Sequence, residues 1–166
     1  MLRRILTWAN KKRIIYDNAR KRKDIIHGSS ALKEQMGIFA RTPGDIDIFS
    51  LHPRVSAIET KTSLNNSSGG DFFYTKPSRH KGTIKIKYVG HDNIKGNEDD
   101  VDVVDYTKME NNIKTINDNE LRFRTIDDIK RSKINSLRDK SYYYRHEKDK
   151  EDLNKIRLFK LLKGKK

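Results

Sequence analysis

The sequence predicts a single α+β domain in which helices flank a mixed β-sheet and also form the C-terminal part. Three observations carry this prediction. The length of 166 residues is typical of one domain. Several short segments alternate polar and apolar residues, as half-buried strands do. Both ends of the chain instead carry apolar residues at helical spacing.

The first half of the chain alternates helical and strand patterns in an α/β-like manner. Apolar residues from Leu2 to Ile15 recur at helical spacing, with basic residues between them. Residues 45–50 alternate polar and apolar side chains as a strand does, and Pro53 suits the first turn of a helix. The elements expected here are a helix to about Arg22, a strand at 24–27, a helix at 31–36, a strand at 45–50, and a helix from Pro53 to about Leu64 with Val55, Ile58 and Leu64 on its buried side.

The second half is richer in strands before it becomes helical. Residues 65–70 form a loop by composition, residues 82–89 alternate clearly enough to be a strand, and the polar segment 91–100 predicts a hairpin connection. The other elements expected are short strands at 71–74, 101–106 and 121–123, and helices from Ile126 to about Tyr142 and from Glu147 to about Leu162.

Charge is the most uneven feature of the composition. The 37 Lys and Arg residues exceed the 23 Asp and Glu residues, which gives a net charge of +14, and both termini are basic. A positive potential concentrates polyanions such as nucleic acid or nucleoside triphosphates, although a lysine-rich bias with solvated surfaces gives the same count. We divide the chain into a basic N-terminal helix (1–23), a core (24–125) and C-terminal helices with a basic tail (126–166).

The composition also excludes several classes of protein. No run approaches the roughly 18 apolar residues of a membrane span, and the first residues hold too short an apolar stretch for a secretory signal, so we expect no integral membrane association. Without cysteine the chain has no disulfide, thiol nucleophile or cysteine-based zinc site, which is compatible with a cytoplasmic protein. The five histidines show no metal-ligand spacing.

A glycine-serine turn between a predicted strand and a predicted helix is the first candidate site. Gly28 lets the backbone approach a phosphate closely. Ser29 and Ser30 follow at the start of the helix, where hydroxyl and N–H donors and the helix dipole favour an anion. The turn therefore predicts a cradle for the β- and γ-phosphates of a triphosphate.

Acidic residues on two predicted strands are the second candidate. Asp45 and Asp47 lie two residues apart, so both carboxylates face the same side of the sheet. Neighbouring carboxylates repel one another unless a cation neutralises them, and oxygen ligands suit Mg²⁺. Asp102 brings a third carboxylate from a later strand, and Asp105 competes with it for that place. Three acids can hold two metal ions about 3.5–4 Å apart.

Three lysines are candidates for contact with phosphates. Lys85 and Lys87 share one face of a predicted strand and can steady a leaving pyrophosphate, although solvated strand lysines are equally expected. Lys133 is a comparable candidate from a C-terminal helix. The three tyrosines at 142–144 can stack on a base, yet aromatic residues that pack between helices are commoner.

These motifs together resemble the nucleotidyltransferase superfamily of the DNA polymerase beta type. The resemblance lies in His27-Gly28-Ser29, Asp45-Ile46-Asp47-Ile48 and Val101-Asp102-Val103, with a spacer of 15 residues that is slightly long and with His27 at a position that is apolar in that family. The segment from Ile126 to Leu153 resembles the helical tail of small members, including the toxin-like AbiEii group.

The resemblance implies a nucleotidyltransferase fold and transfer of a nucleoside monophosphate from an NTP to a hydroxyl, with pyrophosphate leaving. It implies that Asp45 and Asp47 bind two Mg²⁺ ions, while Asp102 binds the catalytic ion and orients or deprotonates the acceptor hydroxyl. Strand alternation places Asp102 and Asp105 on opposite faces, and the Val-Asp-Val context favours Asp102. The basic termini favour RNA or tRNA as acceptor, and the toxin-like relatives imply an antitoxin-like partner protein.

Two other functions stay open. A catalytically inactive module of the same fold can bind nucleic acid or a partner protein, although the survival of all three acids speaks against it. The basic N-terminal helix can instead hold the chain on a membrane surface or serve as an organellar targeting peptide.

Overall fold

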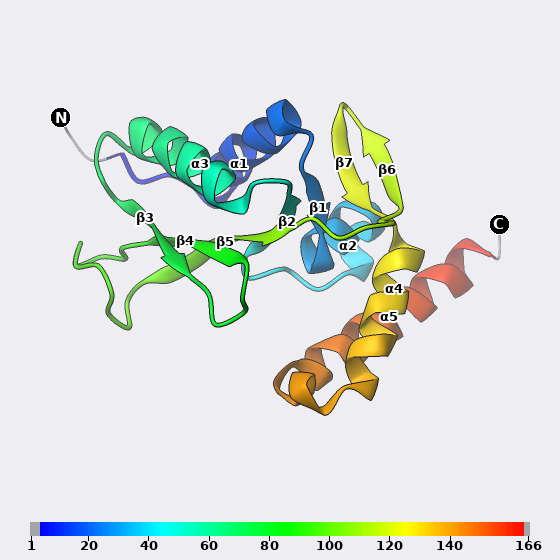
Figure 1. Cartoon of the computed structure of the whole chain (residues 1–166). Coiled ribbons are helices and arrows are strands. Elements are labelled where there is room, and N and C mark those ends of the chain that lie inside the picture. Colours follow the sequence, from blue (N-terminus) through cyan, green and yellow to red (C-terminus); the bar gives the residue numbers. More distant parts are fainter. Residues whose placement is uncertain (1–3, 165–166) are drawn as a thin grey trace.

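A seven-stranded mixed sheet runs through the computed structural model, which describes residues 4–164 (Figure 1). The strand order is β3-β4-β5-β2-β1-β7-β6. The pairs β1/β7 and β2/β5 are parallel, and the other neighbours are antiparallel. The strands are β1 (Ile25–His27), β2 (Ile46–Ser50), β3 (Phe73–Pro77), β4 (Thr83–Tyr88), β5 (Val101–Lys108), β6 (Thr115–Asp118) and β7 (Leu121–Arg124).

Helices cover the two faces of this sheet unequally. Helices α1 and α3 pack against one another and lie along one face, whereas α2 packs on the other face against β1 and β2 (Figure 1). Helices α4 and α5 pair with one another and extend away from the sheet beside α2. The helical elements are α1 (Trp8–Arg22), α2 (Gly28–Met36), the 3₁₀ helix η1 (Gly37–Phe39), α3 (Pro53–Ser68), α4 (Ile126–Arg138), the 3₁₀ helix η2 (Lys140–Arg145) and α5 (His146–Lys163).

This architecture confirms the predicted α+β fold, a mixed sheet flanked by helices with a helical C-terminal part. The alternation along β2 divides the strand as expected. Ile46 and Ile48 are buried in the hydrophobic core, and Asp47 and Phe49 point to the opposite face. The core thus fixes which side of the sheet carries the acids.

The buried side of α3 differs from the prediction. Val55 and Ile58 are exposed by 52% and 46%, and of the three residues expected inside only Leu64 is buried. Small and hydroxyl-bearing residues take their place. Ser56 Oγ lies 2.6 Å from Ser50 Oγ, and Thr60 Oγ1 lies 2.6 Å from the hydroxyl of Tyr106. Hydrogen bonds between α3 and the sheet therefore replace part of the expected apolar contact.

Several element boundaries also differ from those expected. Helix α1 begins at Trp8, because the Thr7 hydroxyl caps it by accepting from Asn10 N at 3.2 Å; Leu2 lies outside the described residues. Helix α4 ends at Arg138, and Asp139 caps the separate helix η2. Strand β6 has no counterpart among the elements expected from the sequence. None of the described helices is both long and apolar enough to cross a membrane.

Candidate active site

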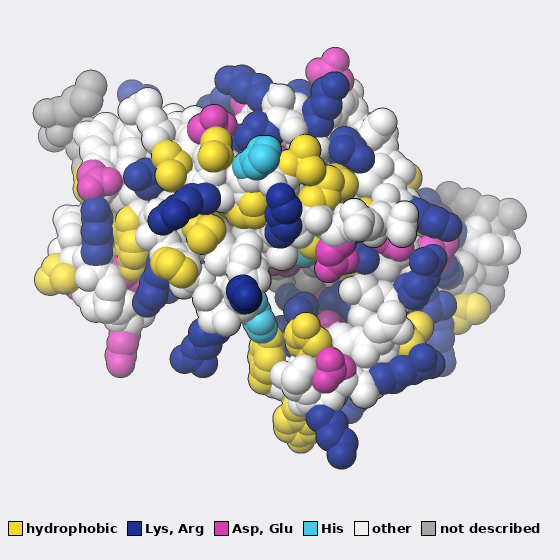
Figure 2. Space-filling model, in the orientation of Figure 1, with side chains coloured by type: hydrophobic (Ala, Val, Ile, Leu, Met, Phe, Trp, Pro, Cys, Tyr) yellow, Lys and Arg dark blue, Asp and Glu magenta, His cyan; other side chains and the backbone are white. Residues whose placement is uncertain are grey.

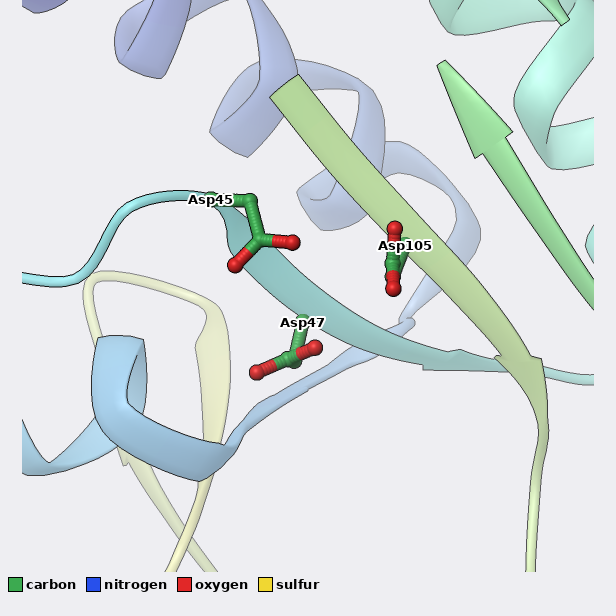
Figure 3. A group of neighbouring side chains, drawn as sticks. All are labelled: Asp45, Asp47 and Asp105. Carbon is green, nitrogen blue, oxygen red and sulfur yellow. The ribbon is translucent and has the colours of Figure 1, made fainter. Parts of the chain in front are cut away.

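Three carboxylates gather on one side of the sheet (Figure 3). Asp45 directly precedes β2, Asp47 lies on β2, and Asp105 lies opposite Asp47 on the parallel neighbour β5. One oxygen from each carboxylate lies within 4.8 Å of the others, and the group can hold a metal ion. The sequence prediction for Asp45 and Asp47 as neighbours on one face thus agrees with their positions.

Asp102 lies outside this group, because the parallel register of β2 and β5 places Asp105, and not Asp102, opposite Asp47. The register of β4 against β5 shifts between Ile86 and Lys87, so that the adjacent residues Val103 and Val104 are both buried. Strict alternation places Asp102 and Asp105 on opposite faces, but the extra residue brings them to the same side. Both acids therefore face the side of the cluster, but only Asp105 lies opposite Asp47 and joins it.

Asp102 is instead held by lysines of β4. Lys85 Nζ donates to Asp102 Oδ2 at 2.8 Å, and Lys87 Nζ lies 2.9 Å from Asp102 Oδ1. Burial opposes the ionisation of Asp102, but the two lysine contacts outweigh it and lower its pKa. Lys85 Nζ also lies 3.3 Å from Asp105 Oδ2. This lysine, which was predicted to contact phosphates, therefore contacts the acid cluster through Asp105.

The pKa values of the clustered acids reflect their crowding. Burial, followed by the negative charges of Asp45 and Asp105, raises the pKa of Asp47 to about 7. Burial and then Asp45 raise the pKa of Asp105 to about 6, although Lys85 acts in the opposite direction. Bringing a cation to these oxygens relieves this unfavourable arrangement.

The residues present fit a divalent cation on two further counts. Asp105 Oδ1 is buried and accepts no hydrogen bond from any described residue. Asp45 and Asp47 form no ion pair with a Lys or Arg of residues 4–164. The cluster therefore offers hard, uncompensated oxygen ligands of the kind that Mg²⁺ takes.

The start of α2 lies directly beside the acids. Gly28 adopts φ +60°, and no side chain caps the first turn of the helix, which leaves its N–H groups available to an anion. The two serines of the predicted cradle have other partners. Ser30 Oγ donates to the carbonyl of Asp45 at 3.0 Å, and Ser29 Oγ donates to Asp152 Oδ2 at 3.2 Å. Their hydroxyls hold the loop in place, while the backbone remains free.

A cavity of about 500 Å³ opens in front of the acids, between the sheet and the lobe formed by α4, η2 and α5. Gly28, Asp47 and Asp105 line one wall, and Lys133 and Arg145 line the opposite one. Figure 2 shows the hollow at this junction, with Lys and Arg side chains around it. The cavity brings the metal-binding group, the free helix start and basic side chains into one space.

Lys133 is the most deeply buried cation of this wall. Its Nζ lies 2.9 Å from both Asp149 Oδ1 and Asp152 Oδ2, and Arg41 Nε donates to Asp152 Oδ1 at 2.9 Å. Together with Ser29, these ion pairs tie the start of α2 to α4 and α5. Lys133 thus lines the cavity as predicted for a phosphate contact, but its charge is already shared by two carboxylates.

Sequence reasoning did not single out several residues of the cavity. His27 stacks on Phe49 with ring centroids 3.7 Å apart, and burial, followed by nearby cations, lowers the pKa of His27 to about 3. Lys81 lines the wall without any motif to mark it in the sequence, whereas Arg145 belongs to the C-terminal segment that carried the resemblance but was given no role. Only the three-residue spacing of Asp149 and Asp152, which places both on one helix face, gave a signal.

Comparison with solved structures decides the fold. No protein-family model matches the sequence, and no curated protein matches it. The Megavirus polyadenylate synthase matches 90% of the chain with a TM-score of 0.67 at 18% sequence identity. The chain has the nucleotidyltransferase fold. It spans 31% of the length of that synthase.

Two Helicobacter pylori proteins show weaker likeness to this nucleotidyltransferase fold. JHP933 is 12% identical with a TM-score of 0.49, and a candidate nucleotidyltransferase is 14% identical with a TM-score of 0.48. Each match covers 76% of this chain, and 54% and 56% of the respective relatives.

Proposed function

We propose that the protein is a Mg²⁺-dependent nucleotidyltransferase that transfers a nucleoside monophosphate from an NTP to a hydroxyl group. One observation carries the proposal: one carboxylate oxygen each of Asp45, Asp47 and Asp105 lies within 4.8 Å of the others, and Asp47 and Asp105 line a cavity together with Gly28 at the uncapped start of α2. Metal-ligating oxygens and phosphate-binding N–H groups thus face the same space, as phosphoryl transfer requires.

The roles follow from the positions of the side chains. Asp45, Asp47 and Asp105 would hold two metal ions. The bound metal would neutralise phosphate charge and lower the pKa of the attacking hydroxyl. The N–H groups at Gly28, Ser29 and Ser30 would donate to the β- and γ-phosphates. Asp105, which lies opposite Asp47 on β5, would also orient the acceptor hydroxyl and take its proton. The hydroxyl oxygen then bonds to the α-phosphorus as the bond to pyrophosphate breaks.

A polynucleotide, RNA or tRNA, is the acceptor that we propose. The net charge of +14 favours a polyanion. The structural relative is a polyadenylate synthase, whose product is itself a polynucleotide. A second cavity of about 280 Å³ adjoins the first and shares Glu110, Arg124, Ser132 and Asn135 with it. Its amide and hydroxyl groups are of the type that contacts base edges.

Transfer of label from an NTP to an acceptor tests the proposed function. The protein is incubated with Mg²⁺, each α-labelled NTP in turn, and total RNA or tRNA. We expect label on the acceptor, abolished by Asp45→Ala combined with Asp47→Ala and retained by Asp118→Ala, an exposed acid on β6. Labelling that survives the double substitution contradicts the proposal. Polyanion binding by calorimetry with no transfer and no Mg²⁺-dependent NTP binding supports the inactive module instead.

Salt dependence tests the acceptor class. Because contacts to a polynucleotide backbone release counterions, the KM for an RNA acceptor should rise steeply with salt, whereas that for a small neutral acceptor should hardly change. A toxin-like role with an antitoxin-like partner in the cytoplasm stays a prediction. Its test is growth arrest on expression that the same double substitution removes.

A further inference from the structure

The four Lys and Arg residues that line the main cavity differ in what they already bind. Lys133 is shared by two buried carboxylates. Arg124 Nε donates to Asp128 Oδ2 at 2.7 Å, and its side chain is only 11% exposed. These two cations are neutralised within the protein and stabilise its structure.

Lys81 and Arg145 are the other two cations that line the cavity. Lys81 forms no ion pair with any side chain of the described part of the chain, and it is exposed. Arg145 forms one ion pair, with Nε 3.6 Å from Asp149 Oδ2, and 46% of its side chain is exposed. Arg145 lines the same cavity as Asp47 and Asp105 of the acid cluster.

A contact between neighbouring residues joins the two segments that carry these cations. The hydroxyl of Tyr144 lies 2.6 Å from His80 Nε2, and the two rings stack with centroids 6.0 Å apart and planes at 24°. His80 directly precedes Lys81 in the turn between β3 and β4, and Tyr144 directly precedes Arg145 at the end of η2. The contact connects the turn between β3 and β4 to η2, and residues of both segments line the cavity.

We propose that Lys81 and Arg145 form a phosphate clamp on the cavity, set in position by the contact between His80 and Tyr144. The proposal rests on the proposed function and deepens it, since it names the side chains that hold its phosphates. A guanidinium can donate two parallel N–H groups to a phosphate, and an ammonium adds a point charge. The ligand is a chain of phosphates, which is either the triphosphate of the NTP or the backbone of the acceptor.

Two binding measurements on the full chain distinguish these sources. Calorimetry measures the affinity for inorganic tripolyphosphate with Mg²⁺, and fluorescence anisotropy measures the affinity for a labelled RNA oligonucleotide. The variants are Lys81→Ala and Arg145→Ala, with Lys21→Ala on α1 and Arg157→Ala on α5 as controls that remove the same charges from exposed positions outside both cavities.

We expect each clamp variant to lower the affinity for one of the two ligands by on the order of tenfold or more, which corresponds to the loss of one charge-assisted hydrogen bond. The controls should change the affinity for either ligand by less than about twofold. Weaker binding of tripolyphosphate identifies the triphosphate as the ligand, and weaker binding of RNA alone identifies the acceptor. Unchanged affinity for both ligands, or wild-type protein that binds neither, overturns the clamp. Binding that follows this pattern without any transfer activity overturns the proposed function and leaves the clamp.

Tyr144→Phe tests the positioning role, because it removes the hydroxyl and keeps the ring. We expect it to weaken the same ligand as Arg145→Ala, and the double variant to be no weaker than Arg145→Ala alone. A contact that only stabilises the fold would lower the unfolding midpoint and leave the affinity for both ligands unchanged, and this result would remove His80 and Tyr144 from the proposal.

Discussion

Gly28 lies so close to Asp47 that a β-carbon on residue 28 would come within 2.6 Å of Asp47 Oδ2. The antiparallel register of β1 and β2 explains this proximity, since it places His27 directly opposite Asp47. The start of α2 and a metal-binding acid of our proposed site are therefore packed with no room for a side chain between them.

The substitution Gly28→Ala tests this contact. At φ +60° an alanine costs about 1–2 kcal/mol of folding free energy, and here it must also displace the Asp47 carboxylate. We expect lower stability in urea unfolding and a higher Mg²⁺ concentration for half-maximal activity. Gly37→Ala is a matched control, because Gly37 has φ +58° and a β-carbon added there would meet no heavy atom within 4 Å. It should lose stability through its backbone conformation alone and keep its Mg²⁺ requirement.

The third acid of the cluster is tested by comparing Asp105→Asn with Asp102→Asn. Asp105→Asn removes a charged ligand of the proposed metal. Because a bound metal stabilises the transition state by several kcal/mol, kcat should fall about 10²–10⁴-fold. Asp102→Asn only releases Lys85 and Lys87, both partly exposed, so its effect should stay below about tenfold. Steady-state kinetics at saturating Mg²⁺ measures both. The reverse ranking would return Asp102 to the site.

The clustered acids also make stability depend on pH. The pKa of Asp47 is raised to about 7 and that of Asp105 to about 6, both above the ordinary value of 3.8. Between about pH 4 and pH 7 the folded chain therefore keeps protons that the unfolded chain has released, so without metal the free energy of unfolding falls as pH rises through this window.

Mg²⁺ binds the ionised acids, so it should raise the thermal midpoint more at about pH 8 than at about pH 5. Thermal melts with and without Mg²⁺ at both values measure this difference. Asp47→Asn should flatten the pH dependence and remove most of the Mg²⁺ effect. Equal effects of Mg²⁺ at the two pH values would contradict a metal on these carboxylates.

Lys133→Met addresses the buried ion pairs of the C-terminal lobe. It leaves the buried carboxylates of Asp149 and Asp152 without their shared cation, and we expect a loss of about 3–5 kcal/mol in urea unfolding. Lys130→Met, at an exposed position of the same helix, should change stability by less than about 0.5 kcal/mol. A Lys133→Met protein of normal stability but weakened NTP binding would favour the phosphate contact predicted from the sequence.

Much of the site was predictable because it consists of residues close together in the sequence, whose pattern can be seen locally. Alternation predicted the shared face of Asp45 and Asp47. Gly28 was expected to let the backbone approach a phosphate, and in the structure its close neighbour is Asp47. The choice between Asp102 and Asp105 was not local. It depended on the pairing of β5 with β2, which places Asp105 opposite Asp47 and which no local pattern defines.

Other differences have the same kind of cause. Strand β6 carries a single apolar residue, Ile116, and its pairing with β7 in space, not its own pattern, makes it a strand. The clamp residues Lys81 and Arg145 lie far apart in the sequence, and only the tertiary fold places them on one cavity. Local patterns therefore give the elements and the acids, while long-range packing decides which further side chains join them.

The hydrogen bond from Ser29 to Asp152 connects residues 123 positions apart. Contacts between such distant segments form late, because closing a long loop costs entropy before the contact stabilises it. As the chain is synthesised from its N-terminus, the strands that carry the acids can pair well before α5 exists. We therefore expect the sheet to be complete first and the cavity to form only when α5 docks, so that the order of assembly determines when the proposed site is complete.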